Sequence, residues 1–373
     1  MAVVTGSPVG GRTGAPPVAV PPGAPPVAVV GVTASGKSDV ALDIARRFGR
    51  QRVRSLPGPT GPGAEAEVEL VSVDSMAVYR YMDIGTTKLV GAERRGVRVH
   101  LTDVADPGHE FTVRQYQTLA RRALAAIGAR GNQALLVGGT GLYLRSVVDG
   151  LDFPPRFPDL SAALEAELEV AGRAGADALA GAQASLHRRL AAIDPVAASR
   201  IEPSNRRRLV RALEVSIGSG RPFSSYGPGL GAYPPTGCRL FGITYDREAV
   251  DRRIAERFDA MLDAGLLAEV RALADRPDGI ARTARQALGY RELLDHLAGR
   301  TSLAEARDEA VRRTRAFARR QWAWFRRDPR IVWLDGRGDP AGQILDVMAS
   351  GPCPGTAGCV HQSRPRVRVE RCS

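Results

Sequence analysis

One eight-residue segment constrains the fold of this chain more than any other feature. Residues 31–38 read Gly-Val-Thr-Ala-Ser-Gly-Lys-Ser, which matches the phosphate-loop pattern GxxxxGK[ST]. The apolar run at residues 27–30 predicts a buried strand before the segment, and Val40, Leu42 and Ile44 predict a helix after it. The motif requires this strand–loop–helix context, so the pattern favours an α/β fold over an unrelated Gly-rich turn.

The same segment predicts a ligand. In such loops the backbone amides at a helix N-terminus surround anionic oxygens. We expect Lys37 to neutralise the distal phosphate and the Ser38 hydroxyl to bind Mg²⁺. The predicted diphosphate or nucleotide site comprises Gly31, Val32, Thr33, Ala34, Ser35, Gly36, Lys37 and Ser38. The segment therefore indicates a polyphosphate, without telling which one.

Lysine is used at two places in the whole chain. Of 52 lysines and arginines, the lysines are Lys37 and Lys88. Genome composition accounts for arginine wherever either cation serves. A compact ammonium on a flexible stem fits a tight nest of amides better than a planar guanidinium does. Lys37 and Lys88 are therefore candidates for positions that arginine cannot fill.

Length and composition limit the class of protein. With 373 residues, 44% hydrophobic and 25% charged, the chain predicts one large domain or two smaller ones, and no apolar run is long enough to span a membrane. Residues 1–26, rich in Pro and Gly, lack a signal-peptide core and predict a disordered leader. Four cysteines make no disulfide framework here and favour the cytoplasm. The Cys and His spacing of residues 351–373 matches no usual zinc pattern, so we expect a disordered basic tail there.

The net charge of +12 is unevenly distributed. Residues 206–330 hold 25 Arg against 16 acids, a balance of +9, whereas residues 27–205 have a balance of +1. A solvated, salt-bridged surface would be mixed in sign everywhere. The asymmetry favours a polyanionic partner larger than one phosphate ester.

Alternating strands and helices predict the architecture. The expected strands lie at residues 27–30, 68–73, 97–101, 133–137 and 240–244, and the expected helices of the core at residues 38–48, 112–130, 246–275, 284–298 and 302–327. Gly-rich loops after the strands indicate a parallel sheet with helices on both faces, and ligands at the carboxyl ends of the strands. We interpret residues 27–153 and 206–340 as a P-loop α/β core with C-terminal helices, residues 154–205 as an inserted helical subdomain, and residues 49–66 as a loop insertion.

Polar residues follow two of the expected strands. Asp74 follows residues 68–73, where its carboxylate can ligate Mg²⁺, act as general base for an attacking nucleophile, or form the N-cap of a helix in the following segment. Gly138, Gly139 and Thr140 follow residues 133–137, where the glycines permit close approach of a ligand and Thr140 offers a hydroxyl. A tight turn explains the second motif equally well.

Two segments concentrate arginine. The first contains Arg206, Arg207, Arg208 and Arg211. In residues 307–327, helical spacing predicts a buried seam of Val311, Thr314, Ala318, Trp322 and Phe325. Flanking stripes contain Arg312, Arg315, Arg319 and Arg326, then Arg313, Arg320 and Arg327. A solvated face is the usual explanation for such a helix, but it normally mixes signs, so these stripes favour a phosphodiester backbone.

These motifs, taken in order, resemble the bacterial tRNA isopentenyltransferase family, the tRNA dimethylallyltransferases, over about residues 27–335. The matching segments lie at residues 31–38, 72–75, 79–88, 100–103, 137–143, 194–195, 207–215, 253–258, 289–292 and 314–326. They include Asp83-Ile84-Gly85-Thr86 followed by Lys88, and Gly289-Tyr290-Arg291-Glu292. The chain departs from the family pattern at Val32, Ser38 and Leu89, and in using Arg for Lys within residues 314–326.

The resemblance implies an activity: transfer of a dimethylallyl group from its diphosphate to N6 of the adenosine immediately 3′ of the tRNA anticodon. It implies catalytic roles for Asp74, Arg257 and Lys37, with Mg²⁺ at Ser38. Contacts with the anticodon stem-loop are expected at Asp74, Ser75, Met76, Ala77, Thr140, Arg207, Arg208, Arg211, Gln286, Gly289, Tyr290, Arg291, Arg312, Arg315 and Arg319. We expect a monomer with no membrane association.

Two other classes remain open from the residues themselves. An ATP-dependent small-molecule kinase also combines a phosphate loop with a strand-end Asp, but it does not explain the balance of +9 in residues 206–330. An RNA-binding protein with a degenerate nucleotide site would not need to keep Lys37, Ser38 and Asp74 intact.

Overall fold

The computed structural model describes residues 26–48, 66–89, 91–94, 96–227, 229–244 and 246–349. These residues form two compact units. The helical unit is Asp149–Pro235, and the core unit contains the described residues on either side of it. The predicted loop insertion at residues 49–66, the leader and the tail lie essentially outside the described residues.

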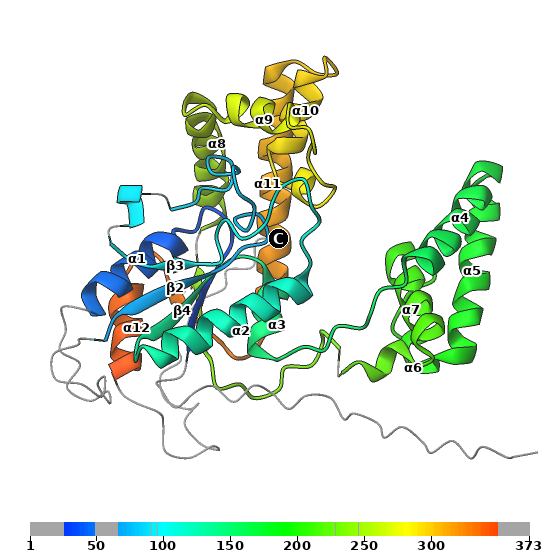
Figure 1. The fold of residues 1–373 in the computed structure, drawn as a ribbon, viewed down its shortest axis with the longest axis horizontal. Helices are drawn as coiled ribbons and strands as arrows, with labels where there is room; N and C mark the ends of the chain where they lie inside the picture. Colours follow the sequence, from blue (N-terminus) through cyan, green and yellow to red (C-terminus); the bar gives the residue numbers. More distant parts are fainter. Residues whose placement is uncertain are drawn as a thin grey trace, which may run out of the picture. The chain divides into compact units, whose positions relative to one another are not determined.

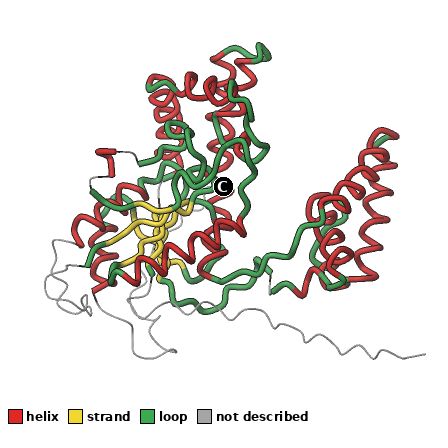
Figure 2. Tube along the Cα trace, in the orientation of Figure 1, coloured by secondary structure: helices red, strands yellow, loops and turns green. Residues whose placement is uncertain are grey.

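The core unit is built on a six-stranded sheet (Figures 1 and 2). Its strands are β1 Val27–Val30, β2 Val68–Val73, β3 Val99–His100, β4 Gln133–Gly138, β5 Arg239–Thr244 and β6 Ile331–Asp335. Every pairing is parallel and the order is β3-β2-β4-β1-β5-β6. The predicted parallel P-loop sheet is thus confirmed. β6 was not predicted. β3 is shorter than the expected strand and ends at His100, where the next residue, Leu101, has positive φ.

Helices cover both faces of the sheet (Figure 1). Val27 and Val29 of β1 pack with α1 Lys37–Phe48 and α12 Pro340–Ala349, whereas Ala28 and Val30 belong to the opposite cluster. This alternation follows from the two-residue period of a strand. Both faces of β1 are buried, as expected for a central strand between parallel neighbours.

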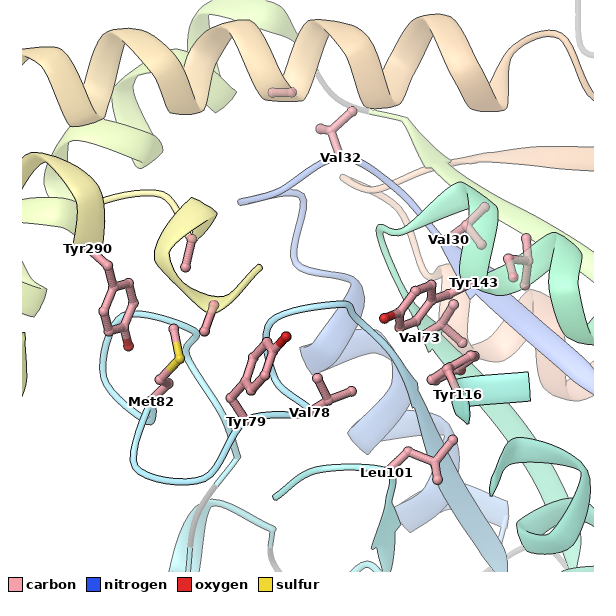
Figure 3. Close-up of a cluster of buried hydrophobic side chains, with 14 of the residues drawn as sticks. Val30, Val32, Val73, Val78, Tyr79, Met82, Leu101, Tyr116, Tyr143 and Tyr290 are labelled. Carbon is pink, nitrogen blue, oxygen red and sulfur yellow. The ribbon is translucent and has the colours of Figure 1, made fainter. Parts of the chain in front are cut away.

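The cluster that contains Ala28 and Val30 also contains aromatic side chains from several elements (Figure 3). Tyr116 of α2 Val113–Ala129 stacks on Tyr143 of α3 Gly141–Val148, with ring centroids 4.1 Å apart. Tyr79, from the segment after β2, is buried in the same cluster. The segment that follows Asp74 is therefore packed into the core.

Four α-helices lie between β5 and β6 in the described part of the core unit. They are α8 Arg247–Asp263, α9 Leu266–Ala274, α10 Tyr290–Leu297 and α11 Leu303–Phe325, with a short 3₁₀ turn, η3, at Ala284–Gln286. α11 packs against α8 and α10. It begins with a capping box between Ser302 and Glu305, which satisfies amides of its first turn.

The helical unit has a separate apolar core. It contains α4 Pro158–Ala174, α5 Ala176–Ile193, α6 Pro195–Ala198, α7 Arg206–Ser219 and the 3₁₀ turn η2 Phe223–Ser225. Leu209 and Leu213 of α7 are buried with Leu168 and Leu186 of the preceding helices. The expected boundary at residue 205 is corrected by this packing, because α7 completes the core of the helical unit and the unit extends to Pro235.

Candidate active site

The phosphate loop connects β1 to α1. Ala34 and Gly36 have φ of 61° and 80°, and the amide of Ser35 donates to the carbonyl of Val32. Lys37 begins α1 and its Nζ donates back to the Val32 carbonyl at 3.2 Å. The lysine side chain therefore folds over its own loop, a path that a compact ammonium can follow.

Two C-terminal helices hold this loop. On α8, Nη2 of Arg257 donates to Oγ1 of Thr33 at 2.5 Å. On α11, Oε1 of Gln321 accepts from the Thr33 amide at 2.8 Å, while its Nε2 donates to the carbonyl of Gly139 at 2.9 Å. Gln321 thus joins the loop after β1 to the loop after β4.

Gln321 was not predicted as a site residue. A signal was present, because residue 321 lies three positions after Ala318 and four before Phe325, both in the predicted buried seam. A polar side chain on a buried helix face needs a partner. The partners could not be named before the fold was known, since Thr33 and Gly139 are far away in the sequence.

Asp74 lies directly after β2. Its Oδ1 accepts from the amides of Met76 and Ala77, at 2.8 and 3.2 Å. The carboxylate therefore closes a turn, but it does not cap a helix, because residues 75–78 form bends and turns. Oδ2 has no hydrogen bond within the part of the chain that the structure describes, so one oxygen fixes the carboxylate and the other is available for chemistry.

Electrostatics link the three candidate catalytic residues. Burial lowers the pKa of Lys37 to about 8, with Asp74 acting to raise it and Arg257 to lower it. Burial also lowers the pKa of Arg257, against the opposing effect of Asp74. One carboxylate, Asp74, and two cations, Lys37 and Arg257, thus share a site. Because burial disfavours the charged forms of the two cations, a bound anion would stabilise them.

The glycines at the end of β4, Gly138 and Gly139, serve close packing. A Cβ on Gly138 would lie 2.0 Å from the carbonyl oxygen of Val73, and one on Gly139 would lie 2.2 Å from Nε2 of Gln321. Thr140 Oγ1 accepts from the amide of Ser75 at 3.1 Å. This motif therefore holds the ends of β2 and β4 together next to Asp74.

The donors present fit a magnesium ion shared with a ligand. Among the described residues, no three His, Cys, Asp or Glu side chains form a metal-binding group. Mg²⁺ does not require one, because it keeps several waters and commonly takes one or two protein ligands plus phosphate oxygens. The exposed Ser38, in the first turn of α1, can supply such a ligand.

The positions expected to contact tRNA in the core unit fall into three groups by exposure. Half-buried side chains are found at Asp74, Ser75, Met76, Thr140 and Arg315. Gln286, Arg291, Arg312 and Arg319 are exposed, whereas Ala77, Gly289 and Tyr290 are buried. The hydroxyl of Tyr290 donates to Oε1 of Glu269 at 2.5 Å. Its ring packs so closely on Gly85 that a Cβ at that position would lie 2.4 Å from the nearest ring atom. The side chain of Tyr290 is therefore engaged within the core, and its expected contact with tRNA stays a prediction.

The arginine stripes of α11 are partly engaged inside the protein. Arg312 pairs with Glu309, Arg313 with Glu292, and Arg315 donates to the carbonyl of Asp251 at 3.1 Å. Arg319, Arg320, Arg326 and Arg327 are exposed. These exposed arginines form the part of the stripes that is open to a partner.

The expected buried seam of α11 is correct except at one residue. Val311, Thr314, Ala318 and Phe325 are buried, but Trp322 is 39% exposed. The centroid of its ring lies 4.7 Å from that of Trp333 on β6. Gln321 occupies the buried direction instead.

In the helical unit, the first arginine set is divided in a similar way. Arg206 pairs with Glu165, and Arg211 donates to Glu214 and to the carbonyl of Pro154. Arg207 and Arg208 are exposed on α7. The exposed pair is the candidate for binding phosphates, and the other two stabilise the helical unit.

The IPP transferase family matches residues 77–328, more than half of the chain. A tRNA dimethylallyltransferase of Streptomyces coelicolor is 46% identical over 318 residues, covering 85% of this chain and 92% of the relative. One from Desulforudis audaxviator is 42% identical over 324 residues, covering 86% and 96%.

Solved structures show the same similarity. The full-length tRNA isopentenylpyrophosphate transferase of Bacillus halodurans is 34% identical, with a TM-score of 0.58 and coverage of 87% of this chain and 94% of that one. A eukaryotic dimethylallyltransferase acting on tRNA has a TM-score of 0.64 at 21% identity, covers 88% and 80% of the two chains, and supports the fold alone. The phosphate loop, the strand-end carboxylate and these similarities lead to one conclusion: the chain belongs to the IPP transferase family.

Proposed function

We propose that this protein transfers the dimethylallyl group of dimethylallyl diphosphate to N6 of the adenosine immediately 3′ of the anticodon in tRNA. The product is N6-isopentenyladenosine. The observation that carries the proposal is the convergence of Lys37, Arg257 and Asp74 in one site of an IPP transferase family member. The names of the similar proteins supply the dimethylallyl group and tRNA, and the choice of N6 of the adenosine next to the anticodon is part of the proposal.

The two cations stabilise the leaving group. Negative charge accumulates on the diphosphate as its allylic C–O bond breaks, so cations held in place beforehand lower the barrier. Lys37 lies within the phosphate loop, and Arg257 is fixed by its hydrogen bond to Thr33. Ser38 would hold a Mg²⁺ ion, which would supply further charge neutralisation for the diphosphate.

Asp74 acts on the acceptor. Its Oδ1 is engaged by two amides, so Oδ2 has a defined direction from which to accept the N6 proton. An exocyclic amine is a weak nucleophile, and holding it in line with the allylic carbon provides much of the acceleration. The adenosine leaves its stack to reach the site.

The exposed arginines bind the tRNA backbone. Arg319 on α11 and Arg207 and Arg208 on α7 are available for phosphates, which position an RNA without reading its sequence. No described helix is long and apolar enough to cross a membrane. We place the protein in the cytoplasm, acting as a monomer.

One assay tests this function against the alternative of a kinase. The purified protein is incubated with Mg²⁺ and either dimethylallyl diphosphate or ATP, with and without an adenosine-containing anticodon stem-loop. We expect diphosphate release and a prenylated nucleoside when dimethylallyl diphosphate and RNA are both present. Phosphate transfer from ATP without prenylation of RNA would overturn the proposal.

A further inference from the structure

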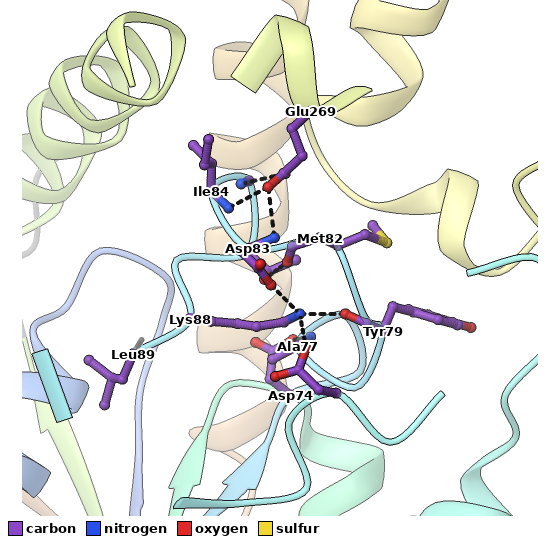
Figure 4. Close-up of polar contacts among 12 residues, drawn as sticks. Asp74, Ala77, Tyr79, Met82, Asp83, Ile84, Lys88, Leu89 and Glu269 are labelled. Atoms are coloured by element: carbon purple, nitrogen blue, oxygen red, sulfur yellow. Dashed lines mark hydrogen bonds and ion pairs between the residues drawn. The ribbon is translucent and has the colours of Figure 1, made fainter. Parts of the chain in front are cut away.

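Lys88, the other lysine of the chain, is buried outside the phosphate loop. Its side chain has 0% exposure. Nζ donates to Oδ1 of Asp83 at 2.8 Å, to Oδ1 of Asp103 at 2.7 Å, and to the carbonyl of Tyr79 (Figure 4). These three acceptors use the three donors of an ammonium. The lysine therefore connects three points of the chain through a single atom.

The residues that Lys88 joins belong to two segments, residues 77–83 and 101–105, which are hydrogen-bonded to each other. The amide of Asp103 donates to the carbonyl of Ala77, and the amide of Ala105 donates to that of Val78. Ala77 is also a donor to Oδ1 of Asp74. A continuous series of hydrogen bonds thus runs from Lys88 through Asp103 and Ala77 to the candidate catalytic carboxylate.

Both segments contain unfavourable backbone conformations. Tyr81, Thr87, Leu101 and Asp103 have φ of 65°, 47°, 66° and 61°. Residues with a side chain rarely adopt such values, and they persist where surrounding contacts over-determine the structure. In sequence Lys88 lies between these strained positions, and it bonds directly to one of them, Asp103.

A residue far along the chain also holds the loop that contains Asp83. Glu269 of α9 accepts from the amides of Asp83, Ile84 and Gly85, at 2.9, 2.9 and 3.3 Å (Figure 4). Tyr290 donates to the same carboxylate. Asp83 thus contacts both Glu269 and Lys88: its amide donates to the first and its carboxylate accepts from the second.

We propose that Lys88 is a positioning residue, whose ammonium ties residues 79–83 to Asp103 and thereby holds Asp74 in its working direction. Lys88 does not contact substrate, because its side chain is fully buried. The inference rests on the proposed function, in which Asp74 accepts a proton. A purely structural role would lower stability and leave the rate of the folded enzyme unchanged.

A double-mutant cycle distinguishes these roles. Lys88→Met, Asp74→Asn and the double variant are compared in single turnover at saturating donor and RNA, well below their melting temperatures. We expect Lys88→Met to react more slowly by on the order of 10²-fold, the loss typical of a misplaced reacting group. In the Asp74→Asn background the same change should cost nothing further, since Lys88 acts through Asp74.

The controls separate this test from the test of function. Binding of dimethylallyl diphosphate should be unchanged in Lys88→Met, because the phosphate loop is a different segment. Arg130→Met removes the exposed cation that pairs with the buried Glu69, and should lower stability without slowing turnover. If Lys88→Met does not fold, Asp103→Asn takes its place in the cycle.

Two results would overturn the inference: a wild-type rate in Lys88→Met, or in Asp103→Asn where that variant is used, and rate losses that multiply in the double variant. Either result leaves the proposed function standing as long as the wild-type protein prenylates RNA. A wild-type protein that does not prenylate RNA refutes the proposed function directly.

Discussion

The two lysines of this chain lie in loops that are stabilised in different ways. Lys37 contacts the carbonyl of Val32, five residues away, within a loop whose shape is a property of its own motif. Lys88 contacts Tyr79, Asp83 and Asp103, and its loop is held further by Glu269 from a distant helix. The comparison teaches that a local motif can be identified from sequence, whereas a loop built by tertiary contacts becomes visible only in the fold.

The largest loss of reaction rate is expected at Asp74, the candidate general base. Asp74→Ala should lower the single-turnover rate by about 10²–10⁴-fold, as for a lost general base. Binding of tRNA should be nearly intact. Asp74→Asn is the matched control, because it keeps an oxygen for the amides of Met76 and Ala77 but cannot accept the proton. A near wild-type rate in both variants would mean that Asp74 only closes a turn.

The phosphate loop should not tolerate arginine at position 37, although the chain uses arginine at nearly every other basic position. Lys37→Arg should weaken binding of dimethylallyl diphosphate and lower turnover by about 10²–10³-fold, as when one preorganised donor is removed. The guanidinium cannot follow the path of the ammonium back to Val32. Isothermal titration and single-turnover kinetics measure the two effects separately. Normal kinetics would mean that the two surviving lysines are an accident of composition.

Lys37 predicts that the affinity for dimethylallyl diphosphate depends on pH. The Lys88→Met variant should retain this dependence. With the pKa of Lys37 at about 8, its ammonium is charged below that pH and loses its proton as the pH rises further. Above pH 8 the affinity for dimethylallyl diphosphate should therefore fall, by up to about tenfold per pH unit for one linked proton. Proton uptake measured by titration in buffers of different ionisation enthalpy checks the sign. Lys37→Met should bind weakly and lack this dependence.

The smallest effect is expected at the surface arginines. Neutralising Arg312, Arg315 and Arg319 together should reduce the salt slope of tRNA binding by at most about 0.7–0.9 for each phosphate that the variant no longer binds. Since Arg315 is held by Asp251 and Arg312 by Glu309, most of the change should come from Arg319.

A contrasting variant tests the separation of the two ligands. Arg257→Ala should impair the diphosphate step and leave the salt slope nearly unchanged, because its side chain contacts Thr33 in the phosphate loop. A wild-type salt slope in the triple variant would show that α11 presents a solvated surface and that tRNA is bound elsewhere.

Much of the core could be predicted because its signals are periodic and local. The strand at residues 68–73 and the helix expected at residues 302–327, which the structure has at Leu303–Phe325, follow from hydrophobic spacing. Trp322 was misassigned because spacing gives a direction on the helix and not the neighbour that covers it. α7 was assigned to the wrong unit because its apolar face does not reveal which helices it packs against.

By itself, the sequence determined the phosphate loop, the parallel α/β core, the family, and Asp74 as a residue at a strand end. These depend on short segments whose conformation is set by neighbouring residues. The tertiary structure decided which partners those segments meet: Gln321 with Thr33, Glu269 with the amides after Asp83, and Lys88 with Asp103. Such contacts join residues far apart in the chain, and a buried polar group shows only that it needs a partner, because packing of the whole core selects which one.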